Sequence, residues 1–215
     1  MLISLLLSNI SVLSAVFPLL AAIYNYKHLD KLMKILALYL LISGAFDFTM
    51  WLAYNLGQNS KTPLNTIPLL HISVATSIVF FGVIYYNLFL KSALKKITLV
   101  LSTIVMLIVL YNARNIFDYP SVSNTASSIL LIILSLVYFY QLLNPQKFIQ
   151  IEKQGLFWVN AGVLVYSSVN IFLFMLFSQI PDKDKADYYV IFSITNIIAN
   201  IIYSIGLLCK PQKTT

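Results

Sequence analysis

Residues 129–140 read ILLIILSLVYFY, and residues 103–111 read TIVMLIVLY. Both stretches are apolar on all sides, whereas the strands of a membrane barrel alternate apolar and polar residues over about ten positions. A backbone in lipid must satisfy its own hydrogen bonds, and a long apolar run does so as an α-helix. The two stretches therefore predict membrane-spanning helices.

Seven runs of this kind follow one another along the chain, each close to the roughly 20 residues that a helix needs to cross a bilayer. They cover residues 2–24, 32–55, 65–90, 96–113, 122–143, 155–178 and 188–208. The chain is 60% hydrophobic and 10% charged, against about 25% charged residues in soluble domains. We predict an all-α polytopic membrane protein in which residues 1–215 form a single domain of seven transmembrane helices.

Basic residues concentrate in alternate connections, and Lys and Arg mark the cytoplasmic side of a membrane protein. Ten lie on the side of the C-terminus: Lys27, Lys31, Lys34, Lys91, Lys95, Lys96, Lys147, Lys153, Lys210 and Lys213. Four lie on the other side: Lys61, Arg114, Lys183 and Lys185. The N-terminus is therefore predicted outside and the C-terminus in the cytoplasm. The net charge of +7 then reflects orientation, and no nucleic-acid partner is expected.

Aromatic residues near the ends of the runs predict interfacial belts, where amphipathic rings meet the lipid headgroups. The inner belt is expected to hold Tyr24, Tyr26, Tyr85, Tyr86, Tyr138, Tyr140 and Trp158. The outer belt is expected to hold Trp51, Tyr54, Tyr111, Tyr119, Tyr188 and Tyr189.

One acid, Asp47, lies inside the apolar stretch ISGAFDFTMW of residues 42–51. The helical rise places it about 12 Å from the outer helix end, with His71 about 9 Å and Asn170 and Asn196 about 12 Å deep. A charge at such depth costs about 2.5–3.5 kcal/mol on insertion scales. Asp47 is therefore predicted to share a proton or a salt bridge with His71, or to be neutral and hydrogen-bonded to Ser, Tyr or Asn.

Further polar residues follow helical spacing, which places them on stripes that should face the bundle interior. They are Tyr39, Ser43 and Asp47; Asn160, Ser167 and Asn170; and Ser193, Asn196, Asn200 and Tyr203. Such residues either bind a ligand or join helices. The predicted ligand-binding or proton-coupling set is Asp47, His71, Asn170, Asn196, Ser43, Tyr39, Ser167 and Asn200.

The sequence lacks the residues that several kinds of membrane-protein chemistry require. No lysine lies between Tyr188 and Cys209, which excludes a retinal Schiff base in the usual rhodopsin position. Two histidines and one cysteine are too few for the zinc site of a membrane hydrolase. No phosphate loop or nucleophile motif is present. We expect no metal and no cofactor, and we predict no enzyme; an intramembrane hydrolase using Asp47 and His71 as an acid–base pair is a lesser alternative.

The stretch GLFWVNAGVLVYSSVNIFLFML, residues 155–176, resembles a segment of a family of small, uncharacterised seven-helix bacterial membrane proteins. Residues 127–143 and 194–207 are similar to that family too. The resemblance implies a multi-pass protein of the bacterial inner membrane. It implies no activity.

The chain also resembles PQ-loop and SWEET-type carriers in helix number, orientation and a possible arrangement of two three-helix repeats joined by a linker helix. That family carries its motif within helices one and five. Here the Pro-Gln pairs at 145–146 and 211–212 lie beyond helices five and seven, and helix one has Pro18-Leu19.

Two functions follow from these features. In the first, a small or lipidic ligand enters the outward-facing polar layer and shifts the helices, and a cytoplasmic or membrane partner receives the signal. In the second, the layer is the substrate site of a proton-coupled small-molecule transporter, with Asp47 as the proton-coupling group.

Overall fold

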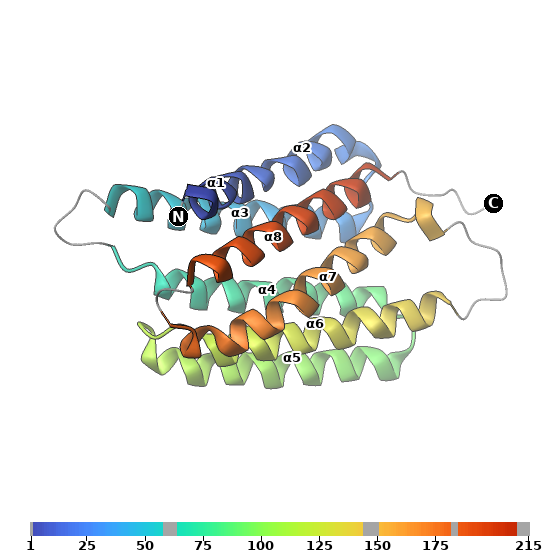
Figure 1. The fold of residues 1–215 in the computed structure, drawn as a ribbon. Coiled ribbons are helices and arrows are strands. Elements are labelled where there is room, and N and C mark those ends of the chain that lie inside the picture. Colours follow the sequence, from blue (N-terminus) through green and yellow to red (C-terminus); the bar gives the residue numbers. More distant parts are fainter. Residues whose placement is uncertain (1, 58–63, 144–150, 182–184, 210–215) are drawn as a thin grey trace.

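The computed structural model describes residues 2–57, 64–143, 151–181 and 185–209 (Figure 1). The regular structure within these ranges is helical. The α-helices are α1 (Leu2–Ser14), α2 (Val16–Asn25), α3 (Lys31–Gly57), α4 (Ile67–Leu88), α5 (Ser92–Asn112), α6 (Ser121–Leu142), α7 (Gly155–Leu176) and α8 (Lys185–Leu208). Single 3-10 turns, η1 to η4, occupy Tyr26–His28, Ala113–Asn115, Ile151–Lys153 and Phe177–Gln179.

Seven helical segments in the described ranges are long and apolar enough to cross a membrane, α1 and α2 together counting as one, which confirms the predicted number of long apolar runs. Their bounds are Ile3–His28, Lys31–Gly57, Ile67–Leu88, Ser92–Asn115, Ser121–Leu142, Gly155–Leu176 and Asp187–Leu208. The two Pro-Gln pairs and Lys61, Lys147, Lys183, Lys210 and Lys213 lie outside the described residues.

The helices form a ring in chain order (Figure 1). Each helix packs against the next, α4 also touches α6, and the ring closes where α1 and α2 pack along α8. We call the end that holds the start of α1, the end of α3 and residues 113–120 the N-terminal end. The opposite end, with Asn25 and Cys209, is the C-terminal end. Whether the ring consists of two repeats and a linker stays a prediction.

The first span differs from the predicted run of 2–24 because it breaks into α1 and α2 at Ala15. Pro18 lies four residues after Ser14. A proline inside a helix has no N–H to donate to the carbonyl four residues earlier, which here is that of Ser14, and the proline ring clashes with this carbonyl. Instead, the Ser14 hydroxyl donates to the Ser11 carbonyl at 2.6 Å, and the Ala15 amide donates to Val12 at 3.3 Å.

Three tyrosines assigned to the belts are buried instead: Tyr85, Tyr138 and Tyr188. Tyr24, by contrast, is 86% exposed, as a belt residue should be. A buried tyrosine needs a partner for its hydroxyl, and Tyr85 and Tyr188 both have one inside the bundle. These three side chains therefore face the bundle and not the surrounding lipid.

Helices α7 and α8 approach each other closely at two glycines. A Cβ atom built on Gly155 would lie 2.5 Å from the Gly206 carbonyl oxygen, and one on Gly206 would lie 2.8 Å from the Gly155 oxygen. Only glycine leaves room for backbones this close. A third glycine on the same face of α7, Gly162, lies under the Tyr203 ring.

Candidate functional site

Asp47 lies half-buried on α3, two to three turns from the end of that helix. Among the described residues its carboxyl makes no hydrogen bond and no ion pair. The groups within electrostatic range are the hydroxyls of Tyr39 and Tyr166. The Tyr39 hydroxyl in turn lies near the side chains of Ser43 on α3 and Ser77 on α4. The acid therefore belongs to a hydroxyl-rich cluster between α3, α4 and α7.

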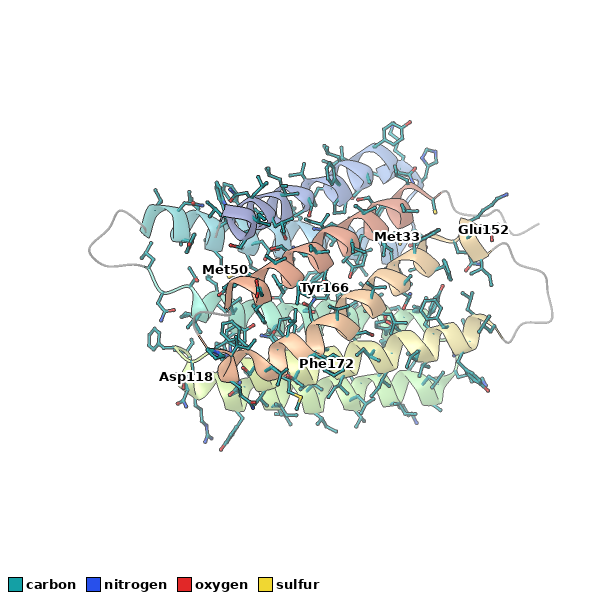
Figure 2. The ribbon with its side chains drawn as sticks, in the orientation of Figure 1. Met33, Met50, Asp118, Glu152, Tyr166 and Phe172 are labelled. Carbon is teal, nitrogen blue, oxygen red and sulfur yellow. The ribbon has the colours of Figure 1, made fainter. Side chains whose placement is uncertain are left out.

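Tyr166 connects this cluster to α8 and to the N-terminal end of the bundle. Figure 2 shows it near the middle of the molecule, where its ring lies 6.4 Å from that of Phe192 on α8. Its hydroxyl is within electrostatic range of Asp47, Tyr39 and Tyr119. Residues four apart on a helix share a face, so Asn170 lies one turn from Tyr166 toward the N-terminal end.

Asn170 and Ser167 are the least satisfied polar residues of α7. Asn170 is 0% exposed, and neither its Nδ2 nor its Oδ1 atom has a hydrogen-bond partner. The Ser167 hydroxyl is likewise buried and unpaired. Leaving a buried polar group unpaired costs about 1–3 kcal/mol, and native proteins pair most such groups. Asn170 and Ser167 are therefore the candidate ligand contacts on α7.

His71, on α4, is buried and bonded to a backbone carbonyl rather than to Asp47. Its Nε2 atom lies 3.0 Å from the oxygen of Asp118, which Figure 2 places at the N-terminal end beside the start of α6. A carbonyl only accepts, so Nε2 carries the hydrogen. In the neutral ring Nδ1 is then an acceptor, and it is buried without a partner. No hydrogen bond or ion pair joins His71 to Asp47 among the described residues.

Asn196 and Asn200 serve a helix interface. The Asn196 amide donates to Ser11 Oγ at 2.9 Å, and the Asn200 amide donates to Ser14 Oγ at 2.8 Å. Both bonds tie α8 to α1. Asn196 and Asn200 therefore hold two helices together, and neither is hydrogen-bonded to Asp47 among the described residues. This matches the alternative prediction that the polar residues join helices.

Aromatic rings cover the N-terminal end of the cluster. Tyr119 stacks on Phe177 with ring centroids 3.9 Å apart, and Phe177 meets Tyr188 at 4.8 Å. The Tyr119 and Tyr188 hydroxyls are 3.0 Å apart. Burial raises the pKa of Tyr119 to about 12, despite the opposing effect of its bond to Tyr188.

A second polar group lies toward the C-terminal end, and the site prediction did not include it. The Tyr85 hydroxyl donates to Asn160 Oδ1 at 2.7 Å and lies 2.7 Å from Ser135 Oγ. The Asn160 amide donates to the Leu156 carbonyl at 2.7 Å. Asn160 was visible as part of a polar stripe, but Tyr85 gave no signal beyond its place near a helix end.

No group of three His, Cys, Asp or Glu side chains able to hold a metal ion occurs in the parts of the chain that the structure describes. Comparison with protein-family models, curated proteins and solved structures found no match. The resemblance of residues 155–176 to small seven-helix bacterial proteins therefore stays a prediction, as does the resemblance to PQ-loop and SWEET-type carriers.

Proposed function

We propose that the chain is a multi-pass protein of the bacterial inner membrane that binds a small or lipidic ligand beside Asp47 and Asn170. Its N-terminal end faces outward, and ligand binding shifts the helices so that a partner protein receives the signal. The observation that carries this proposal is the Asn170 amide, which is fully buried with neither polar atom bonded. A ligand that pairs with it recovers a cost of about 1–3 kcal/mol.

The unpaired atoms favour a ligand that donates hydrogen bonds. Asp47 offers carboxylate oxygens, which accept hydrogen bonds. Asn170 and Ser167 both donate and accept. An amine or ammonium group near Asp47 would also neutralise the charge that makes an intramembrane acid costly. We infer that an amine-bearing or hydroxyl-bearing ligand fits the site best.

The pairing of polar groups in the C-terminal half of the bundle favours ligand binding over transport. A carrier must open its substrate site to each side of the membrane in turn. Toward the C-terminal end, Tyr85, Ser135 and Asn160 are paired with one another. Phe81 and Phe89 lie on either side of the Tyr85 ring, at 6.4 and 5.7 Å. A proton-coupled carrier with Asp47 as its acid remains the second candidate, since that acid has no ion-pair partner among the described residues.

A ligand panel in proteoliposomes tests the proposal. We expect at least one small amine, amino acid, polyol or single-chain lipid to raise the Tm of the wild type. Asp47→Asn and Asn170→Leu should lose that shift, whereas Asp187→Asn, which removes an exposed acid at the start of α8, should keep it. A shift that survives both site variants, or no shift with any compound, contradicts the proposal.

The same proteoliposomes separate the two candidates. Binding without accumulation under a pH gradient supports the sensor. Gradient-driven accumulation that Asp47→Asn abolishes supports the carrier.

Cys209, the single cysteine of the chain, tests the orientation. Burial raises the pKa of its thiol, and Sγ donates to the Ile205 carbonyl at 3.4 Å. Less thiolate forms at a given pH than in a free cysteine, so labelling should be slow at pH 7 and speed up as the pH rises. A membrane-impermeant maleimide should label inside-out vesicles but not intact spheroplasts, with Cys209→Ser as the blank. Labelling of intact spheroplasts would contradict the predicted orientation and place the C-terminus outside.

A further inference from the structure

A groove of about 520 Å³ runs between α4 and α5. Its lining is mainly apolar and includes Val79, Val83, Leu99, Met106 and Leu107. From Ile78 to Asn87 the α4 wall is about 13 Å long at the helical rise of 1.5 Å per residue. Val79, Leu99 and Leu107 are all more than half exposed. The groove therefore opens away from the bundle, on the surface that lipid covers if these helices span a membrane.

Small residues on the floor create the groove. Gly82 on α4 faces Ser102 on α5, and a Cβ atom on Gly82 would lie 3.2 Å from Ser102 Oγ. The Ser102 hydroxyl is buried and has no hydrogen-bond partner. Larger residues at these two positions would close the floor. The space fits a flexible chain that fills irregular apolar volume.

Positive charge gathers where the groove meets the C-terminal end. Tyr86 lines the groove, and Lys95 Nζ lies 5.6 Å from the centroid of its ring. Lys91 and Lys96 flank Lys95 at the start of α5, and residues 89–96 contain no acid. Lysines at the end of an apolar groove between helices suit a lipid whose headgroup is negatively charged.

We propose that this groove binds an anionic phospholipid, with an acyl chain between α4 and α5 and the phosphate beside Lys91, Lys95 and Lys96. The aliphatic stems of the lysines cover the upper chain while their amines reach the headgroup. Each lysine near an anionic headgroup contributes about 1 kcal/mol, so three account for a selectivity of about a hundredfold or less over a zwitterionic lipid. This site stands apart from the one beside Asp47.

A second groove, of about 470 Å³ between α2 and α8, has a similar size and an apolar lining that includes Phe17, Leu20, Ile201 and Leu208. Among the residues that the structure describes, no basic residue lines it. It supplies a control for filling a groove, because Ser204 also lies in its wall. The substitution Ser204→Trp should fill this groove without touching the one between α4 and α5.

Native mass spectrometry of the full chain, released from micelles with equal amounts of dioleoylphosphatidylglycerol and dioleoylphosphatidylcholine, tests the proposal. We expect the wild type to retain phosphatidylglycerol at least tenfold more than phosphatidylcholine. The triple variant with Lys91→Gln, Lys95→Gln and Lys96→Gln should fall close to parity. Thr103→Trp, at an exposed position of the groove wall, should lose the retained lipid, and Ser204→Trp should keep it.

A matched charge control separates the site from general attraction. Lys27, Lys31 and Lys34 are exposed lysines at the same end of the bundle, and Lys34 also lies over a tyrosine ring, that of Tyr26. Replacing these three by glutamine should leave the preference unchanged. Equal retention of both lipids by the wild type, or an equal loss of preference in the two triple variants, would overturn the proposal. So would a preference that Thr103→Trp leaves intact.

Discussion

Gly155→Ala should lower the free energy of unfolding by about 1–3 kcal/mol, the usual cost of overpacking a tight contact. The added methyl would lie 2.5 Å from the Gly206 carbonyl oxygen, which belongs to the backbone and cannot rotate away. The ends of α7 and α8 must therefore separate. Denaturant unfolding of the purified protein in mixed micelles measures the loss, and Gly206→Ala should show a similar one.

Gly44→Ala is the matched control for this contact. A Cβ atom there would meet only the Ala15 Cβ atom, at an ordinary 3.8 Å. Alanine is also a better helix former than glycine by about 1 kcal/mol. The same substitution should therefore stabilise at Gly44 and destabilise at Gly155. Equal effects at the two sites would show that α7 and α8 do not meet through their glycines.

Tyr85→Phe should cost about 1–3 kcal/mol of unfolding free energy, since it removes a buried hydroxyl and leaves Asn160 Oδ1 without its partner. Values near the lower end are expected because polar contacts between membrane helices average about 0.6 kcal/mol in mutant cycles. Removing both partners should cost less than the sum of the single losses, because the Asn160 oxygen that Tyr85→Phe leaves unpaired is then also gone. Unfolding of Tyr85→Phe, Asn160→Leu and the double variant gives this coupling.

An additive cycle would contradict the hydrogen bond between Tyr85 and Asn160. Tyr39→Phe is a useful comparison because no hydrogen bond joins the Tyr39 hydroxyl to Asn160 among the described residues. The unfolding free energy lost in Tyr39→Phe should be the same whether residue 160 is asparagine or leucine.

The helices were the most predictable part of the fold. A run such as residues 129–140 is apolar on all sides, and in lipid this leaves the backbone only one way to satisfy its hydrogen bonds. The break at Ala15 was not predicted, although Pro18 supplies its physical cause. Apolar runs locate helices well, but a proline within such a run changes hydropathy little while it disrupts the helix.

The candidate site was predictable in its residue types and less so in its contacts. Asp47, Tyr39 and Ser43 do share one stripe of α3 and lie in one cluster with Tyr166. His71 instead pairs with the Asp118 carbonyl. Every residue has a backbone carbonyl, so no sequence pattern marks this one as the partner.

The other differences between the predicted and the observed contacts arise because the sequence does not show which helices pack against each other. Asn196 and Asn200 follow helical spacing and face a helix, as expected, yet that helix is α1. Which helices adjoin in a bundle depends on how all the faces pack together. The same holds for Tyr85, because its position in the sequence does not reveal that Ser135 and Asn160 lie opposite it.

The central claim is that a polar ligand site lies between Asp47, Tyr166 and Asn170, and a high-resolution electron cryomicroscopy map of the protein purified from its native membrane tests it most directly. We predict non-protein density within hydrogen-bonding distance of the Asn170 amide and facing the Asp47 carboxyl. A map in which protein side chains alone satisfy the Asn170 amide, with apolar groups filling the space between it and Asp47, would contradict the claim.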